Sequence, residues 1–544
     1  MGKPTSFALF AAMVVRYCSQ VSAGTPTPAP HPIDDTLNVV DQVVDSLRAT
    51  SEEVVPWFYE QMTQVYFQDT DEETRLVHLR AIIAARASGR PVELTQRSED
   101  GSEWTSMRPL DYPGVLSELV AELPRDLPLR AAKIHTARDG TLVIDTFEFG
   151  EVDPCDLDDP EQAAKLEDTI AYAATEVPNW TPDAIQEFFK RCSSDVVLTL
   201  TPLRMAQHWN LFQQVSGTES TAVVLESESD LTQSRISVAV ANSTRRTMLE
   251  RIAERLSNAS INIHRAYLDT LDDGANGNVS FVGFVVTDPT GGPIASDSRL
   301  WQRVRHDLLR IKWADQRAID LSQRHADLDL THAELIVALG DLVHQVLVAK
   351  NRYAFTSERV RRLAIDNLPL TAAIVDLFLD RFQPDHPIEE ERFDDRATTL
   401  RELIDADVDL EDARYVLQSM LDAVTATLRT NIFIESRYAL ALRLDPTFLQ
   451  SPERPDLPYG VFFVHGRGFN GFHVRFRDIA RGGVRAVLPR SGPQFTREAE
   501  RLYDEAYGLA SAQQLKNKDI PEGGAKAAIL VHPNESCDRS VKAF

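Results

Sequence analysis

Two basic residues near the C-terminus stand directly beside paired glycines. Arg481 precedes Gly482 and Gly483, and Lys526 follows Gly523-Gly524-Ala525. Because glycine has no β-carbon, the backbone can turn sharply or approach a ligand closely at such positions. A cation held there is better placed for a small anion than a solvated surface lysine is. The spacing therefore predicts a site for a small anion.

Further cations lie between the two glycine pairs. Arg485 follows the first pair, and Lys516 and Lys518 lie where a predicted helix over residues 497–515 ends. Two cations can each hold one carboxylate, while a third amine can exchange protons near neutral pH if burial and neighbouring cations lower its pKa. This set of residues favours a dicarboxylate as the ligand.

A glycine motif at residues 466–471 (GRGFNG) fits the GxGxxG pattern of dinucleotide-binding folds. That fingerprint requires a helix directly after the glycines, so that the pyrophosphate meets a helix N-terminus. Residues 472–477 (FHVRFR) alternate instead as a strand does. We therefore predict a hairpin turn at this motif and no nucleotide site.

Three runs in this region are similar to known enzymes. They are FNGFHVRFRDI at 469–479, ARGGVR at 480–485 and LYDEAYGLASAQQLKNKDIPEGGAK at 502–526. Together they resemble the substrate domain of glutamate dehydrogenases, in particular the large-type NAD-specific class, in which a long N-terminal region with ACT-like modules precedes the catalytic core. The resemblance implies NAD-dependent oxidative deamination of L-glutamate to 2-oxoglutarate and ammonium.

The resemblance also implies roles for individual residues. Lys526 corresponds to the catalytic acid/base, and Arg481 to the residue that contacts the side-chain carboxylate of the substrate. Dehydrogenases for amino acids with apolar side chains would not need Arg481. Lys516 is the match for the lysine that holds the α-carboxylate, with Lys518 as an alternative. The glycines assigned to the substrate site are Gly482, Gly483, Gly523 and Gly524.

The sequence departs from the family in two ways. The family usually has glycine after the catalytic lysine, whereas Ala527 and Ala528 follow here, and these would either crowd the site or shift the start of the next strand. The sequence ends at Phe544, before the family's catalytic aspartate and nucleotide-binding domain. We therefore expect an N-terminal part of an enzyme, inactive by itself, with the NAD site in the missing domain.

A second class of function stays open at this point. A non-catalytic, ACT-type amino-acid-sensing protein could use the ACT-like units and a relic of the substrate domain. The length of the chain favours that alternative, and the intact set of cations opposes it. For the enzyme, the expected partners are glutamate and 2-oxoglutarate, an amino-acid effector at the ACT-like units and, at full length, further copies in a homo-oligomer.

The segments before the site repeat one pattern. In each copy a helix is followed by two β-rich runs, at 115–123, 131–136 and 141–149, and at 245–256, 261–267 and 278–287. Asp139-Gly140 is a strong hairpin signal, and a strand at 235–240 precedes the second helix. Both copies resemble the ACT-type regulatory module, a βαββαβ unit.

The predicted fold class is multidomain α/β and α+β: two ACT-like βαββαβ units, helical connecting regions and a partial substrate-binding α/β domain. The predicted segments are a flexible N-terminal segment at 1–34, a helical pair with the first ACT-like unit at 35–160, a helical linker at 161–232, the second ACT-like unit at 233–299, a helical domain at 300–430 and the partial catalytic domain at 431–544.

The composition of the chain excludes several classes of partner. The 544 residues carry 57 Lys/Arg against 82 Asp/Glu, a net charge of −25, so nucleic acid would be repelled. The apolar run at 6–15 is too short to span a bilayer, and no membrane partner is expected. Four scattered cysteines fit neither a disulfide framework nor zinc spacing, so we expect no metal and a reducing compartment, the cytoplasm or, in a eukaryote, the mitochondrial matrix.

Overall fold

The structure is a computed structural model in which the chain divides into two compact units. The first unit holds the described residues up to Val92 together with short segments around Met107 and at Ala137–Leu142, and the second unit holds the rest. The structure describes residues 48, 50–88, 92–97, 102–108, 115–123, 129–150, 153–227, 232–243, 245–325, 328–516 and 522–544. The N-terminal segment 1–34 and Lys518 lie outside these residues.

Helices build the first unit. They are a helical stretch at 50–61, α3 (Gln64–Asp69) and α4 (Glu72–Ser88). Phe58 and Tyr66 meet edge to face with ring centroids 5.3 Å apart, and the Tyr66 hydroxyl shares a 2.9 Å hydrogen bond with His78 Nδ1. Burial disfavours the imidazolium and lowers the pKa of His78 to about 4. The part of the predicted helical pair that lies among the described residues is thus helical, and the segment before residue 48 lies outside the described residues.

Two four-stranded sheets of the same topology follow along the chain. Their strand orders are β1-β2-β4-β3 and β5-β6-β8-β7, and one helix joins the second and third strands of each. The first comprises β1 (Val92–Arg97), β2 (Ser102–Arg108), α5 (Val115–Glu122), β3 (Leu129–Thr136) and β4 (Val143–Phe149). The second comprises β5 (Thr221–Ser227), β6 (Ser234–Ala241), α10 (Arg245–Asn258), β7 (Asn262–Asp272) and β8 (Asn278–Thr287). The predicted repeat of one α/β pattern is confirmed.

The order of strands differs from the expected βαββαβ. Both sheets read ββαββ, because β5 pairs antiparallel with β6 and thereby occupies the edge that the final strand of a βαββαβ unit would take. The sequence analysis did not predict β1, β2 or β5. The sequence of β5, TAVVLES, has a short continuous apolar run instead of strict alternation, so its pattern is ambiguous.

The two sheets share one hydrophobic core in the second unit. Their edge strands β3 and β7 lie side by side, and α5 packs against α10. Met248, Ile252 and Leu256 form the apolar stripe of α10, and all three are buried in this core. The helical spacing that predicted α10 therefore also identified its buried face.

Helices connect these sheets to the C-terminal region. Along the chain, four helices come between the two four-stranded sheets: α6 (Pro160–Glu176), α7 (Pro182–Phe189), α8 (Ser194–Thr199) and α9 (Pro202–Val215). After them come α11 (Arg299–Arg310), α12 (Gln316–Arg324), α13 (Leu330–Lys350), α14 (Ser357–Asp366), α15 (Leu368–Phe382), α16 (Glu390–Asp407) and α17 (Glu411–Ala426). Thr181 caps α7, where its hydroxyl accepts a hydrogen bond from the Ala184 amide.

Helix α13 is the central helix of the largest core. It is long and apolar enough to cross a membrane by length and composition, and most of it is buried inside the structure. Leu335, Leu339 and Leu342 are fully buried in the core that α13 shares with the C-terminal sheet. The leucine stripe is thus accounted for by packing between these elements.

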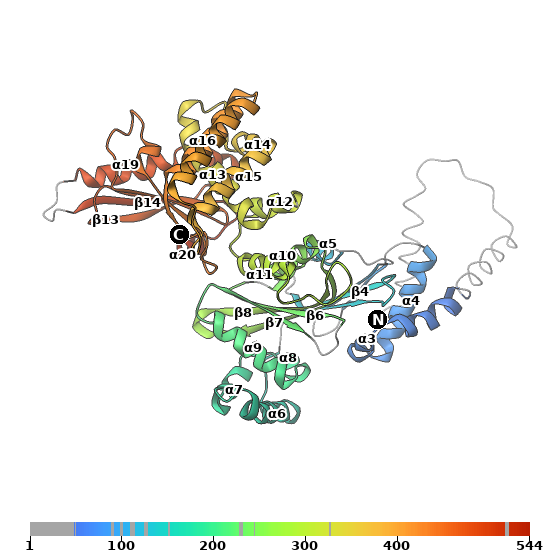
Figure 1. The fold of residues 1–544 in the computed structure, drawn as a ribbon. Helices are drawn as coiled ribbons and strands as arrows, with labels where there is room; N and C mark the ends of the chain where they lie inside the picture. Colours follow the sequence, from blue (N-terminus) through green and yellow to red (C-terminus); the bar gives the residue numbers. More distant parts are fainter. Residues whose placement is uncertain are drawn as a thin grey trace, which may run out of the picture. The chain divides into compact units, whose positions relative to one another are not determined.

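A six-stranded sheet occupies the C-terminal region in orange and red (Figure 1), with strand order β13-β14-β12-β11-β10-β9. Its strands are β9 (Thr427–Thr430), β10 (Leu440–Leu444), β11 (Gly460–Gly466), β12 (Phe469–Arg475), β13 (Ala480–Val487) and β14 (Gly523–Val531). β13 pairs parallel with β14, and the connection between them contains α18 (Gly492–Ala499) and α19 (Leu502–Gln514). Helix α20 (Cys537–Ala543) follows β14.

The motif at 466–471 is the hairpin that the sequence predicted. β11 and β12 pair antiparallel, and Gly466 faces Phe469 across the turn. Gly468 has a φ of +64°, a conformation that suits glycine. A strand follows the glycines, so no helix N-terminus is present to meet a pyrophosphate.

The single helix predicted over residues 497–515 is interrupted, and two helices stand in its place. α18 ends at Ala499 and α19 begins at Leu502. Gln345 of α13 satisfies the backbone at this break: its amide nitrogen donates to the Ala499 carbonyl at 2.7 Å, and its carbonyl accepts from the Tyr503 amide at 3.1 Å. A side chain more than 150 residues away in sequence thus stabilises the interruption, which local periodicity could not reveal.

Candidate functional site

The two glycine pairs lie next to each other on the parallel strands β13 and β14. In the register of this pair, Arg481 is opposite Gly524, Gly482 is opposite Ala525 and Gly483 is opposite Lys526. Two segments more than 40 residues apart in sequence therefore converge. Arg481 and Lys526 therefore lie on neighbouring strands, two positions apart in this register.

The glycines allow a close approach of backbones. A β-carbon at Gly482 would overlap the carbonyl group of Ala525, and one at Gly523 would overlap the side chain of Arg477. A β-carbon at Gly524 would overlap the backbone of α19 at Ala510 and Gln514. The expectation of sharp turns is wrong for Gly482, Gly523 and Gly524, which lie within strands and permit tight strand and helix packing, while the approach of a ligand stays a prediction.

Helix α19 fixes the start of β14. The Gly524 amide donates a 2.8 Å hydrogen bond to the Oε1 atom of Gln514, which is the last residue of α19. Alternation along β14 places Gly524 and Lys526 on the same face, which is the face that α19 covers. The position of Lys526 is therefore set by the packing of α19 on β14.

Lys526 is partly buried and lies over Gly483. A β-carbon at Gly483 would lie 3.5 Å from Lys526 Nζ, so the amine sits beside the bare backbone of β13. Among the described residues none forms a hydrogen bond or ion pair with this amine. A partly buried amine without a protein partner is suited to act on a ligand.

The two arginines of β13 each have an acidic neighbour. Arg481 Nη1 is 3.9 Å from Glu522 Oε2, and the Arg481 side chain is 71% exposed. Arg485 Nε is 2.7 Å from Glu505 Oε1 on α19. The first pair is long and solvent-exposed, so it holds Arg481 weakly and leaves its guanidinium available to a carboxylate.

The lysine proposed for the α-carboxylate is placed less tightly. Lys516 is exposed and follows the end of α19 by two residues. Within the described part of the chain, no contact joins Lys516 to Arg481 or Lys526. The alternative, Lys518, lies outside the described residues, so both assignments stay predictions.

The two alanines after Lys526 belong to the sheet interior. Ala528 is opposite Phe472 of β12 and is fully buried, while Ala527 is opposite His473 and is 3% exposed. They continue β14 as core residues. The family difference at these positions is therefore accommodated by β12.

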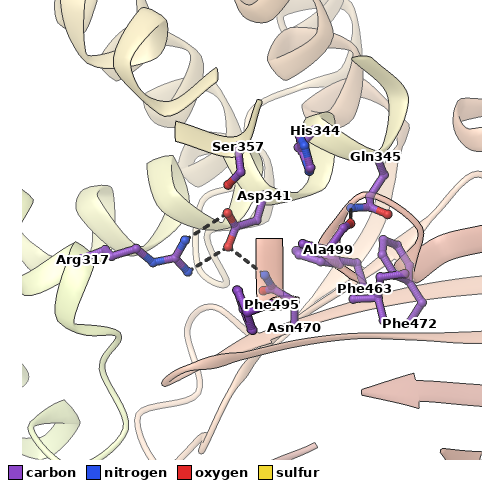
Figure 2. A pocket seen from close by; sticks show the side chains of 11 residues that line it. Arg317, Asp341, His344, Gln345, Ser357, Phe463, Asn470, Phe472, Phe495 and Ala499 are labelled. Carbon is purple, nitrogen blue, oxygen red and sulfur yellow. Dashed lines mark hydrogen bonds and ion pairs between the residues drawn. The ribbon is translucent and has the colours of Figure 1, made fainter. Parts of the chain in front are cut away.

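A second polar cluster, which the sequence analysis missed, lies under α13 (Figure 2). Arg317 of α12 forks onto Asp341 of α13 with distances of 3.1 and 2.8 Å, and the Asn470 amide of β12 donates to Asp341 at 2.8 Å. Asp315 accepts from the same guanidinium at 3.0 Å. His465 Nδ1 shares a 2.7 Å hydrogen bond with Asn470. The cluster ties two helices to the C-terminal sheet.

Electrostatics and size indicate a structural role for this cluster. Burial opposes ionisation of Asp315, but Arg317 and His465 outweigh it and lower its pKa to about 2. Burial likewise opposes ionisation of Asp341, and Arg317 again holds its pKa below the usual value. The adjoining cavity measures about 30 Å³, which has room for water but not for a dicarboxylate.

His332 of α13 lies between two carboxylates: its Nδ1 is 2.7 Å from Asp329 and its Nε2 is 3.0 Å from Asp376 of α15. The hydrogen bond with Asp329, helped by Asp376, raises the pKa of His332 to about 9. The spacing of Asp329 and His332, three residues apart at a helix start, was a signal that could have predicted the first contact.

Comparison with known proteins gives a family match over the region that contains β13 and β14. Residues 399–542 match the family described as bacterial NAD-glutamate dehydrogenase, catalytic domain. The matched range includes β9 to β14 and therefore both strands of the site. The predicted resemblance to large-type NAD-specific glutamate dehydrogenases is confirmed for this region.

Individual relatives carry the same name. The chain is 47% identical over 145 residues to an NAD-specific glutamate dehydrogenase of Neurospora crassa, which covers 27% of this chain and 14% of the relative. It is 52% identical over 107 residues to one of Saccharomyces cerevisiae, covering 20% and 10%. It is 34% identical over 134 residues to one of Mycobacterium tuberculosis, covering 24% and 8%. Each match thus spans a small share of the relative's length.

Proposed function

We propose that this chain provides the substrate-binding part of an NAD-dependent glutamate dehydrogenase, an oxidoreductase that converts L-glutamate, NAD and water to 2-oxoglutarate, ammonium and NADH. The observation that carries the proposal is the register of β13 and β14, which places Arg481 and Lys526 on adjacent strands with Lys526 Nζ beside Gly483. The name of the matched catalytic-domain family supports the same reaction.

In the proposed site each cation has a separate task. The exposed guanidinium of Arg481 binds the side-chain carboxylate of glutamate by displacing the long contact with Glu522. Lys516 binds the α-carboxylate, with Lys518 as the alternative. Gly482 keeps β13 close to β14, Gly524 keeps α19 close to β14, and Gly483 and Gly523 leave room for the side chains of Lys526 and Arg477, so the substrate lies between fixed charges.

Lys526 is the proposed acid/base. After the α-carbon has lost hydride and the amine a proton, the substrate is an iminium, and water adds to its α-carbon while Lys526 Nζ takes the proton of that water. Lys526 then returns this proton to the nitrogen of the carbinolamine, and it takes the hydroxyl proton as the carbonyl forms and the carbon–nitrogen bond breaks. Ammonia leaves and takes up a proton as ammonium, and 2-oxoglutarate remains.

NAD would accept the hydride in this reaction. The motif at 466–471 does not fit it, because its backbone continues as β12 and a β-carbon at Gly468 would overlap Glu535. No residue of the described chain is therefore assigned to NAD. The NAD-specific relatives support the choice of cofactor.

We further propose that the two ββαββ sheets act as an ACT-like pair. Their equal topology, the contact of β3 with β7 and the packing of α5 on α10 support this idea. In such a pair an amino-acid effector would bind at the shared interface, and assembly into a homo-oligomer would follow in the intact enzyme. The alternative of a purely amino-acid-sensing protein is less well supported, since it needs no cations at β13 and β14.

The test is turnover of glutamate by the intact enzyme carrying Lys526→Ala. Reduction of NAD, followed by absorbance, should fall by at least ~10²-fold, as expected for loss of a general acid/base. Lys190→Ala is the matched control, because Lys190 is an exposed lysine paired with Glu187 on α7. Near-normal turnover by Lys526→Ala, at an unchanged melting temperature, would remove the proposal.

A further inference from the structure

A pocket of about 120 Å³ lies away from the strands β13 and β14. Its walls come from the start of β5, from α11 and the segment after it, and from the loop before β10. We call it the Arg305 pocket. The lining residues are Ser220, Thr221, Arg305, Leu309, Trp313, Glu435, Ser436, Arg437 and Tyr438.

The mouth of this pocket has one charge of each sign. Arg305 Nη1 is 3.4 Å from Glu435 Oε1, and the two side chains are 42% and 57% exposed. Exposed pairs of this kind contribute little to stability and open readily. Arg305 and Glu435 can therefore separate, and each can pair with a group of opposite charge on a ligand.

Behind the mouth lies a buried excess of positive charge. Arg310 and Arg437 both bind the carboxylate of Glu334, at 2.6 and 2.7 Å, and all three side chains are at most 5% exposed. Two guanidiniums thus share one carboxylate. Backbone carbonyls of Ile432 and Ile434 also accept from Arg437, but they carry no full charge, so an additional anion near Arg437 would be stabilising.

Unpartnered polar atoms lie in the same wall. Arg437 Nε and the hydroxyl oxygen of Thr221 are buried and have no hydrogen-bond partner among the described residues. Buried donors without partners are uncommon in folded proteins and commonly mark a bound water, ion or ligand. Arg437 and Thr221 are both pocket residues, so the observation points to the Arg305 pocket.

The apolar part of the pocket is built on two aromatic rings. The rings of Trp313 and Tyr438 stack at a centroid distance of 4.9 Å. The backbone of Glu219 holds both side chains in place: its carbonyl accepts a hydrogen bond from Trp313 Nε1 at 2.9 Å, and its amide donates one to the Tyr438 hydroxyl at 3.3 Å. With Leu309 these rings offer a small preformed apolar wall, which limits the ligand's side chain to a few carbon atoms.

We propose that the Arg305 pocket binds a small neutral α-amino acid as its zwitterion. The carboxylate pairs with Arg305 and lies toward Arg437, the ammonium pairs with Glu435, and the side chain lies against Trp313 and Leu309. The ligand would bridge β5 of the second four-stranded sheet and the loop that leads into β10 of the C-terminal sheet. This site is separate from both the β13–β14 site and the interface of α5 with α10.

The experiment is calorimetry on the full chain with L-alanine as the probe. Propionate, which lacks the ammonium, and ethylamine, which lacks the carboxylate, are the matched ligands. We expect saturable binding of L-alanine and at least tenfold weaker binding of the other two. Arg305→Gln should weaken L-alanine binding at least tenfold, and Glu435→Gln should abolish the preference for L-alanine over propionate. Arg362→Gln, in another exposed helical Arg–Glu pair, should change nothing.

The design separates this site from the proposed substrate site. In Arg481→Ala, L-alanine binding should persist. Loss of binding in Arg481→Ala but not in Arg305→Gln would overturn the Arg305 pocket and leave the proposed function standing. Equal binding of propionate and L-alanine by the unaltered chain would reveal an anion site only, and absence of saturable heat with L-alanine would also overturn the proposal. Circular dichroism of Arg305→Gln and Arg305→Lys establishes that any loss is not unfolding.

Discussion

The guanidinium groups of Arg317 and Arg481 differ in how completely acidic side chains pair with them. Arg317 forms two-pronged contacts with Asp341 and further bonds to Asp315, and both carboxylates are largely buried. Arg481 stands mostly in solvent with one acidic group 3.9 Å away. The first arrangement satisfies its charges inside the protein, whereas the second leaves donors unused.

The surroundings of the two arginines explain the difference. Arg317 lies where α12, α13 and β12 meet, and removing charged groups from water there requires partners with good geometry. Arg481 lies on β13, an edge strand whose residues 481–485 are exposed. Charges that hold elements together are thus paired by the fold, and those left loosely paired on a glycine-lined strand are available to a ligand.

The largest effect should come from breaking the paired cluster. Asp341→Ala leaves Arg317 with one carboxylate and Asn470 without its acceptor, so the free energy of unfolding should fall by about 3 kcal/mol. Urea denaturation measures this change in the free energy of unfolding. Asp341→Asn, which keeps the shape and part of the hydrogen bonding, should lose less. A loss below about 0.5 kcal/mol in Asp341→Ala would mean that this cluster does not hold the elements together.

The strand pair of the site should be next in sensitivity. In Gly482→Ala the new methyl group would overlap the Ala525 carbonyl and push β13 from β14, which should cost about 2 kcal/mol and misplace Arg481. Thermal melting and glutamate turnover should both fall. The control is Gly508→Ala on α19, where nothing lies within 4 Å; that change should stabilise by about 0.5–1 kcal/mol. Equal melting temperatures for both variants would refute the close approach of β13 and β14.

The sequence predicted the chemistry of this site better than its architecture. Glycine pairs beside Arg481 and Lys526 singled out both residues, since few structural roles need a cation there. The strand β13 was not predicted, because glycine is depleted in strands and the run 480–485 has no alternation of apolar residues. For β14 the sequence indicated only that a strand follows Lys526, and not that the strand already includes Gly523 and Gly524. The parallel register that joins the two segments is a tertiary property.

Periodic elements with one buried face were predicted well, and long-range polar contacts were not. Helix α10 and strand β8 agree with the predicted ranges within two residues because their side chains repeat with the period of the element. The contacts of Asp341 with Arg317 and Asn470 join residues 24 and 129 positions apart. Such partners have no periodic signature, so only the fold reveals them.

A smaller effect is expected from the loosely held arginine. Arg481→Ala should leave the melting temperature unchanged, because its exposed contact with Glu522 contributes little. The apparent KM for glutamate should rise by roughly tenfold, since a carboxylate clamp acts in the ground state as well as in the transition state. Steady-state kinetics of the intact enzyme gives both constants. A lowered kcat at unchanged KM would assign Arg481 to the chemical step instead.

The smallest effect concerns a paired histidine. Asp329 and Asp376 stabilise the imidazolium of His332 and raise its pKa to about 9, above the usual 6.5. A raised pKa contributes stability that is complete below pH 6.5 and is lost as the pH rises through 9. His332→Gln should therefore lower the free energy of unfolding by about 1 kcal/mol at pH 6 and by little at pH 9.5. His386→Gln, at an exposed histidine, is the control. If urea denaturation gives the same loss at both pH values, the partners of His332 do not stabilise its charge, and this structural ion cluster would then resemble the loosely paired Arg481 rather than Arg317.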